Sequence, residues 1–265
     1  MDRYSSQYAF DNGLDQERAR LSSLESLLDI GTIYHLEQLG ISEASMCLEV
    51  GAGGGSIASW MCGQVGQSGK VVAYDLQTAM LKELKWANLE IIEEDILSGQ
   101  LPKNTFDIVH TRWLLHWLTR RKQAIAELVQ CLRPGGWLLA EEPDCITTSL
   151  SLPKSFGRVV TSAFAELEAL GGGMDTRYGR ELYADVREAG LVNVAAQGRV
   201  GMIHGGDSRS GSTWLRMSLE MAKKQVLEAN SVTAAEFDRT LEMLDDPRFS
   251  VPSPVTMAVW GRRPG

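Results

Sequence analysis

Between residues 46 and 142 the chain alternates between short apolar runs and segments whose apolar residues lie three and four positions apart. A short apolar run bounded by turn residues is typical of a buried strand, whereas the wider spacing is typical of an amphipathic helix. The pattern predicts strands at 46–50, 70–76, 89–93, 106–111 and 137–141, and helices at 57–62, 78–87 and 121–132. Strands that alternate with helices predict a parallel sheet with helices on both faces.

The regions on either side of this core follow other patterns. Leucine and isoleucine at helical spacing predict amphipathic helices within 14–39, ahead of the first strand. Residues Thr233 to Glu236 have the sequence of a capping box, which begins a helix. Beyond residue 145 helices are predicted at 155–170, 180–189, 214–228 and 234–244, and strands at 192–200 and 255–260. We expect one overall domain in three segments: N-terminal helices forming a lid (1–45), a ligand-binding core (46–145), and cap helices with the last strands (146–265).

The turn after the first strand is the most informative stretch, Leu48-Glu49-Val50-Gly51-Ala52-Gly53-Gly54-Gly55. Glycine tolerates positive φ and has no Cβ, so such a turn lets the backbone approach a ligand closely. The dinucleotide pattern G-x-G-x-x-G fails at its last position, where Ser56 stands. The stretch fits an acidic residue followed by alternating glycines, which moves hydride chemistry to second place.

Two carboxylates follow the next two strands. Asp75 ends the second strand, where a carboxylate accepts hydrogen bonds from both hydroxyls of a ribose. Asp95 follows the third strand and can accept from an exocyclic amine, while Ile96 offers an apolar face to a purine. Because the carboxyl ends of parallel strands share one edge, these residues predict a nucleoside-shaped slot there.

These motifs together resemble the class I S-adenosylmethionine-dependent methyltransferases over about residues 46–142; they are Glu49 to Gly55, Asp75, Asp95-Ile96 and Leu132-Arg133-Pro134-Gly135-Gly136. The resemblance implies a Rossmann-like α/β fold with a seven-stranded, mostly parallel sheet, helices on both faces and a helical cap. It also implies S-adenosylmethionine as cofactor and S-adenosylhomocysteine as product. The cofactor-binding residues that it implies are Glu49, Gly51, Gly53 and Gly55 at the amino-acid end, Asp75 and Leu76 at the ribose, Asp95 and Ile96 at the adenine, Thr111 or Arg112 beside the sulfonium, and Tyr8 in an N-terminal lid.

A narrower resemblance concerns segments outside the core. Tyr8-Ala9-Phe10-Asp11-Asn12, Gly179-Arg180-Glu181-Leu182, Asp245-Asp246-Pro247 and Trp260-Gly261-Arg262-Arg263-Pro264 resemble a bacterial, largely actinomycete branch of the family that acts on small molecules in secondary metabolism. This branch implies methyl transfer to an O, N or C nucleophile of a small apolar or aromatic metabolite, in natural-product biosynthesis.

Candidate catalytic residues lie at the ends of the fourth and fifth strands, where ligands of parallel sheets bind. Transfer of a sulfonium methyl needs chiefly an aligned nucleophile and excluded water, and a general base only where the acceptor loses a proton. Arg112 and His116 follow the fourth strand and Glu142 the fifth, although His116 and Glu142 could equally be buried, hydrogen-bonded groups. No metal is expected, since Glu141-Glu142-x-Asp144 has no second acidic cluster and His35, His110, His116 and His204 lack paired spacing.

Composition narrows the partners. A net charge of −8 argues against nucleic acid, and the absence of an Asp/Asn-Pro-Pro-aromatic motif after the fourth strand argues against base methylation. With four scattered cysteines and neither a leader nor a membrane-spanning run, we expect a cytoplasmic protein with a small-molecule acceptor and no membrane partner. The oligomeric state is left open, a homodimer included. Two alternatives stay open: an NAD(P)-dependent oxidoreductase and a non-catalytic adenosyl-binding protein.

Overall fold

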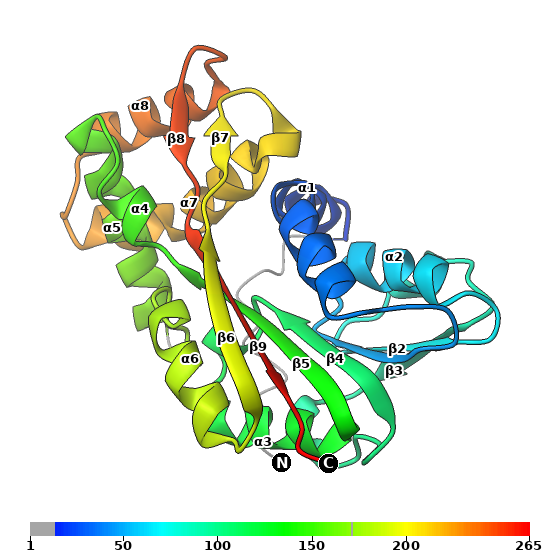
Figure 1. The fold of residues 1–265 in the computed structure, drawn as a ribbon. Coiled ribbons are helices and arrows are strands. Elements are labelled where there is room, and N and C mark those ends of the chain that lie inside the picture. Colours follow the sequence, from blue (N-terminus) through cyan, green and yellow to red (C-terminus); the bar gives the residue numbers. More distant parts are fainter. Residues whose placement is uncertain (1–13, 171) are drawn as a thin grey trace. The chain divides into compact units, whose positions relative to one another are not determined.

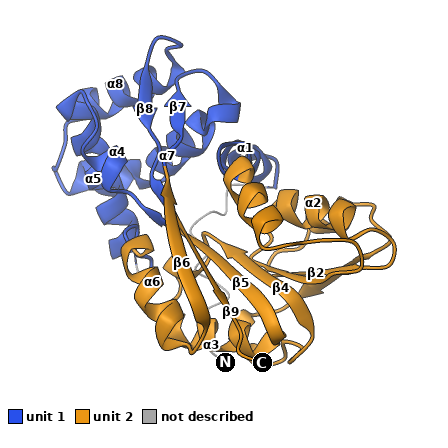
Figure 2. Cartoon of the chain, viewed as in Figure 1, with its two compact units in different colours: residues 1–28, 143–177, 200–256 blue, residues 29–142, 178–199, 257–265 orange. Residues whose placement is uncertain are grey.

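A computed structural model describes residues 14–170 and 172–265 of the 265-residue chain (Figure 1). The chain divides into two compact units whose segments interleave along the sequence (Figure 2). The first, here called the sheet unit, comprises residues 29–142, 178–199 and 257–265. The second, here called the helical unit, comprises the described residues up to 28 together with 143–177 and 200–256. The expected division into three segments stays a prediction.

A seven-stranded sheet forms the sheet unit, with the strand order β3-β2-β1-β4-β5-β9-β6. The strands are β1 (Met46–Val50), β2 (Lys70–Asp75), β3 (Leu89–Glu93), β4 (Phe106–Arg112), β5 (Leu132–Asp144), β6 (Val192–Arg199) and β9 (Val255–Arg262). Strands β1 to β5 pair in parallel, and the strand order reverses between β1 and β4. In open α/β sheets the ligand crevice lies outside the carboxyl ends at this reversal. The predicted α/β fold with a seven-stranded, mostly parallel sheet is confirmed.

Two apolar layers hold this sheet, one on each face. The helices of the sheet unit are α1 (Leu14–Gln38, of which residues 29–38 belong to this unit), α2 (Ser56–Val65), α3 (Arg121–Cys131) and α6 (Gly179–Glu188). Its 3₁₀ turns are η2 (Leu81–Glu83), η3 (Ile96–Ser98) and η4 (Leu115–Trp117). Ile108 of β4 packs in the layer with α1 and α2, whereas its neighbour Val109 packs in the layer with α3 and α6. Successive strand residues point to opposite faces, so consecutive residues at the strand ends serve different layers.

Helices dominate the other unit. It contains α4 (Ile146–Ser149), α5 (Lys154–Ala169), α7 (Ser212–Glu228), α8 (Ala234–Asp245), the 3₁₀ turn η5 (Ser208–Ser210) and an antiparallel pair, β7 (Met202–His204) and β8 (Ser250–Pro252). The capping box of Thr233 and Glu236 is confirmed at the start of α8. The elements β7, β8 and α4 were not predicted, because three or four residues show no measurable periodicity.

The helix predicted at 78–87 is wrong. Only the single turn η2 forms there, and the backbone is extended at Leu84. The Trp86 indole donates to Ser59 Oγ on α2 at 2.7 Å, and Leu81 and Leu84 lie so close to Gly55 that a Cβ there would be within 3 Å of both. These tertiary contacts outweigh the helix propensity of the segment.

The Arg133-Pro134-Gly135-Gly136 motif does more than end a helix. Strand β5 already begins at Leu132, so the motif lies within the strand. Gly135 has φ +82°, and a Cβ on Gly136 would lie 2.8 Å from the carbonyl oxygen of Phe106. Gly136 therefore lets β5 approach β4 where a larger residue would clash with backbone.

Candidate functional site

The glycine turn after β1 needs glycine at each alternate position. Gly51, Gly53 and Gly55 have φ values of +74°, +55° and +88°, all in the left-handed region that other residues rarely adopt. The Gly51 N–H donates to the Tyr74 carbonyl at 2.8 Å, which anchors the start of the turn on β2. The alternation predicted from sequence thus has a backbone cause, and it produces a tight turn at the sheet reversal.

Asp75 reaches this turn from the end of β2. Its Oδ2 accepts a hydrogen bond from the Gly53 N–H, and its Oδ1 accepts from the Gln77 N–H, both at 2.9 Å. Burial raises the pKa of Asp75, while the amides of Gln77, Gly53 and Leu76 act in the opposite direction. A carboxylate has about four acceptor positions, so ribose hydroxyls can still bind to it. Leu76 beside it is 51% exposed at the rim.

Asp95 and Ile96 lie at the next strand end. Asp95 Oδ1 accepts from the Leu97 N–H at 2.8 Å and so caps η3. Ile96 is only 6% exposed and packs in the core on the α3 face. In the structure Ile96 anchors η3 in this core. Its contact with a purine stays a prediction.

Glu49 and Thr111 are both buried at the ends of β1 and β4. Glu49 Oε2 lies 2.6 Å from His110 Nδ1, so its carboxylate is directed into the layer under α1. Thr111 is fully buried, and within the described residues its hydroxyl has no hydrogen-bond partner. Tyr8, the predicted lid residue, lies outside the described residues.

Arg112 and Glu142, two of the predicted catalytic residues, already have several partners. The Arg112 guanidinium donates to Thr32 Oγ1 and Asp29 Oδ1 on α1, both at 2.8 Å. Glu142 is fully buried and accepts from the backbone N–H groups of residues 114, 115 and 116 at 3.1, 2.7 and 3.2 Å. It therefore fixes the backbone of η4, which follows β4.

His116 is the third predicted catalytic residue, and it is paired with Glu142. Its Nδ1 lies 2.8 Å from Glu142 Oε2, and the residue is 3% exposed between the rings of Trp113 and Trp117. Trp113 has φ +54°, which is strained for a bulky residue, and its N–H donates to the Glu141 carbonyl at 2.8 Å. The turn after β4 is thus held in an unfavourable backbone shape, and η4, which contains His116, follows directly.

His110, which no sequence motif singles out, is fully buried between two carboxylates. Its ring nitrogens lie 2.6 Å from Glu49 Oε2 and 3.1 Å from Glu141 Oε2. The signal was present in the strand period, since Glu49 and His110 are paired in register and Glu141 lies on the same face. Only the register between distant strands, which sequence does not reveal, brings the three together.

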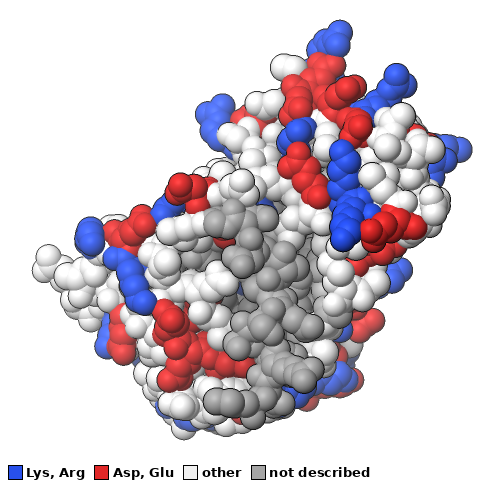
Figure 3. Space-filling view, turned by 180° about the vertical axis from the view of Figure 1, so that it is seen from behind, with Lys and Arg blue, Asp and Glu red and all other residues white. Residues whose placement is uncertain are grey.

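Three further observations concern metal binding, membrane spanning and surface charge among the described residues. Within 14–170 and 172–265 no group of three or more His, Cys, Asp or Glu residues is arranged to hold a metal ion. No helix in that part of the chain is long and apolar enough to cross a membrane. On the face drawn in Figure 3, basic and acidic side chains are interspersed.

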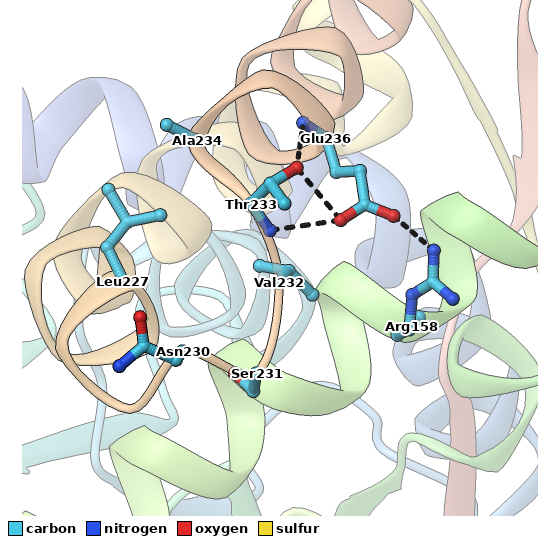
Figure 4. A pocket seen from close by; sticks show the side chains of 8 residues that line it. All are labelled: Arg158, Leu227, Asn230, Ser231, Val232, Thr233, Ala234 and Glu236. Atoms are coloured by element: carbon cyan, nitrogen blue, oxygen red, sulfur yellow. Dashed lines mark hydrogen bonds and ion pairs between the residues drawn. The ribbon is translucent and has the colours of Figure 1, made fainter.

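A separate pocket of about 440 Å³ lies in the helical unit (Figure 4). Its lining residues are Arg158, Leu227, Asn230, Ser231, Val232, Thr233, Ala234 and Glu236. Glu236 pairs with Arg158 and closes the capping box with Thr233. The charged groups of this pocket therefore neutralise each other, and we place the candidate site at the glycine turn.

Comparison with known proteins finds similarity over part of the chain. Residues 48–140 match the model of a methyltransferase domain. A ubiquinone/menaquinone biosynthesis C-methyltransferase from Hahella chejuensis is 27% identical over 141 residues, which cover 48% of this chain and 57% of that relative. The chain thus matches little more than half the length of that curated relative.

Solved structures show the same fold. A SAM-dependent methyltransferase from Aquifex aeolicus superposes with a TM-score of 0.50 at 22% identity, covering 71% of this chain and 93% of its own. The YcgJ protein of Bacillus subtilis superposes with a TM-score of 0.61 at 14% identity, covering 89% and 99%. At such identities the likeness concerns the fold alone.

Proposed function

We propose that this chain moves a methyl group from S-adenosylmethionine to a small metabolite, and the match of residues 48–140 to a methyltransferase domain supports this proposal. The acceptor atom would be an O, N or C nucleophile of an apolar or aromatic compound, as in natural-product biosynthesis. The narrower actinomycete branch and an intracellular location stay predictions. The observation that carries the proposal is the glycine turn with Asp75 bound across it.

The residues at this edge fit such a cofactor. The left-handed glycines would receive its amino-acid end, Asp75 its ribose hydroxyls, and Asp95 the exocyclic amine of adenine. Thr111 supplies an independent observation, because its buried hydroxyl has no partner among the described residues at the strand end where the reacting centre would bind. A buried hydroxyl without a partner costs free energy, which a bound polar ligand would recover.

Methyl transfer from this cofactor requires few catalytic groups from the protein. When bound, S-adenosylmethionine supplies an electrophilic methyl group with a neutral leaving group. The residues at the ends of β4 and β5 would align the acceptor and exclude water. Since Arg112 and Glu142 are held by other protein groups, we propose that Arg112 joins the end of β4 to α1 and that Glu142 positions the turn after β4. His116 is then the side chain best suited to accept a proton, where the acceptor has one to lose.

Titration calorimetry with S-adenosylhomocysteine tests the proposal directly. We expect saturable binding at one site per chain, and transfer of labelled methyl from S-adenosylmethionine to a compound in an extract of the source organism. Absence of binding to the folded protein would remove the proposal. Fluorescence enhancement of NADH would favour the oxidoreductase alternative, and cofactor binding without transfer to any compound would favour the non-catalytic one.

Asp75→Ala should weaken binding of S-adenosylhomocysteine about 100-fold, because the ribose loses its acceptor and the Gly53 N–H loses its partner. Glu93→Gln is the matched control, since Glu93 pairs in register with Asp75 on the neighbouring strand but is exposed and bound to Lys82. Calorimetry should show the control within about twofold of wild type. Equal affinity in the Asp75→Ala variant would mean that the ribose binds elsewhere.

A further inference from the structure

A continuous chain of polar contacts runs beneath α1, on one face of the sheet. At its centre both ring nitrogens of His110 face carboxylate oxygens, Glu49 Oε2 at 2.6 Å and Glu141 Oε2 at 3.1 Å. Carboxylates only accept hydrogen bonds, so both nitrogens donate only when the ring carries two protons. The geometry is therefore that of an imidazolium held between two carboxylates, and all three side chains are buried.

From Glu141 the contacts continue through α1 to the far side of the glycine turn. Thr32 Oγ1 donates to Glu141 at 2.5 Å and accepts from Arg112 at 2.8 Å. Arg112 also donates to Asp29 Oδ1, which accepts from Ser56 Oγ at 3.0 Å. Ser56 is the first residue of α2.

The two ends of this chain of contacts flank the glycine turn. Glu49 lies two residues before Gly51, and Ser56 directly follows Gly55. The turn is thus tied at both ends to one network whose centre is His110. Loss of a proton from His110 would leave two buried carboxylates facing a ring that can donate to only one of them.

We propose that His110 is a positioning residue, which as an imidazolium holds Glu49 and Glu141 together and keeps the glycine turn in the shape that binds the adenosyl ligand. This inference rests on the proposed function, and it adds that ligand affinity depends on the protonation of a group that does not contact the ligand.

The charge of His110 is set by its surroundings. Burial alone would lower the pKa of His110, but the charges and hydrogen bonds of Glu49 and Glu141 outweigh it and raise this pKa to about 9. Other titratable or charged groups toward this cluster include His35 and Asp29 on α1, Arg112 on β4, Arg199 on β6 and Cys47 on β1, whose pKa burial raises. Burial lowers the pKa of His35, so it is neutral across the range in which His110 titrates.

The test compares wild type with His110→Gln by calorimetry with S-adenosylhomocysteine from pH 7 to pH 9.5. A glutamine can donate from only one of its terminal atoms, so we expect affinity about tenfold weaker than wild type at pH 7. The ratio of the two dissociation constants should shrink toward one as the wild-type imidazolium loses its proton. Using the ratio cancels the titration of the amino group of the ligand. His204→Gln, at an exposed position in the helical unit, should behave as wild type at every pH.

The ratio of the two dissociation constants either supports or overturns the positioning role of His110. A ratio of one at pH 7, or a ratio above one that stays constant with pH, overturns the positioning role, since a merely structural effect would not follow the proton. Should the variant fail to fold, ¹⁵N-histidine spectra of wild type at pH 8 give a second measurement, in which at least one ring must remain an imidazolium. Spectra with every ring neutral overturn the proposal. No binding by wild type at any pH would instead refute the proposed function and this inference with it.

Discussion

Glu142→Ala should lower the free energy of unfolding by about 3–5 kcal/mol relative to wild type, because four hydrogen bonds end on this one buried carboxylate. Removing it leaves the backbone N–H groups of residues 114 to 116 without their acceptor, as well as His116 Nδ1. The strained backbone of Trp113 would also lose its support. Urea unfolding followed by circular dichroism measures the difference.

Two variants calibrate this expectation. Glu142→Gln keeps an oxygen but directs an NH₂ group at other donors, so it should fall between alanine and wild type. Glu188→Ala removes an exposed glutamate that pairs with Lys122, and it should change stability by less than about 0.5 kcal/mol. A stability loss below about 1 kcal/mol in Glu142→Ala would show that the turn after β4 does not depend on this carboxylate.

The glycine turn and Asp75 could be predicted because their causes are local. Three alternating glycines signal three left-handed backbone positions, and a carboxylate at the next strand end follows from the parallel order. The structure adds the bond between Asp75 and the Gly53 N–H, which joins the two motifs into one site. That contact spans 22 positions of sequence, and no local pattern specifies it.

The tasks of the acidic residues at the end of β5 could not be predicted in the same way. Glu141 and Glu142 are adjacent, so the strand period sends them to opposite faces. Glu141 meets His110 under α1, whereas Glu142 meets His116 and η4 on the other face. Sequence showed a cluster of carboxylates but not that each has its own histidine, because the partners come from β4 and the turn after it, whose register and backbone shape are tertiary properties.

The failed helix at 78–87 has a related cause. Its leucines have helical spacing, yet in the structure they cover Gly55 and hold the segment against the glycine turn. The conformation of this segment is therefore set by its contacts with the glycine turn and not by its own helix propensity.

The pairing of His116 with Glu142 leads to the other large expected effect. His116 Nδ1 faces the buried carboxylate of Glu142, which fixes the ring and leaves Nε2 as the atom that would take a proton if His116 acts as a general base. For an acceptor that loses a proton on methylation, His116→Gln should lower kcat about 100-fold or more. Binding of S-adenosylhomocysteine should stay within about twofold of wild type, since the base acts on the acceptor and not on the cofactor.

The measurement is methyl transfer to the compound found in the extract screen, with kcat and KM taken for wild type, His116→Gln and His204→Gln. A base role requires that kcat falls in His116→Gln while its cofactor affinity is kept, and that both stay at the wild-type value in His204→Gln. If kcat is unchanged, alignment alone carries the rate and His116 only completes the bonds of Glu142. If kcat and cofactor affinity fall together, His116 supports the shape of the turn after β4, because a proton acceptor would leave cofactor binding intact.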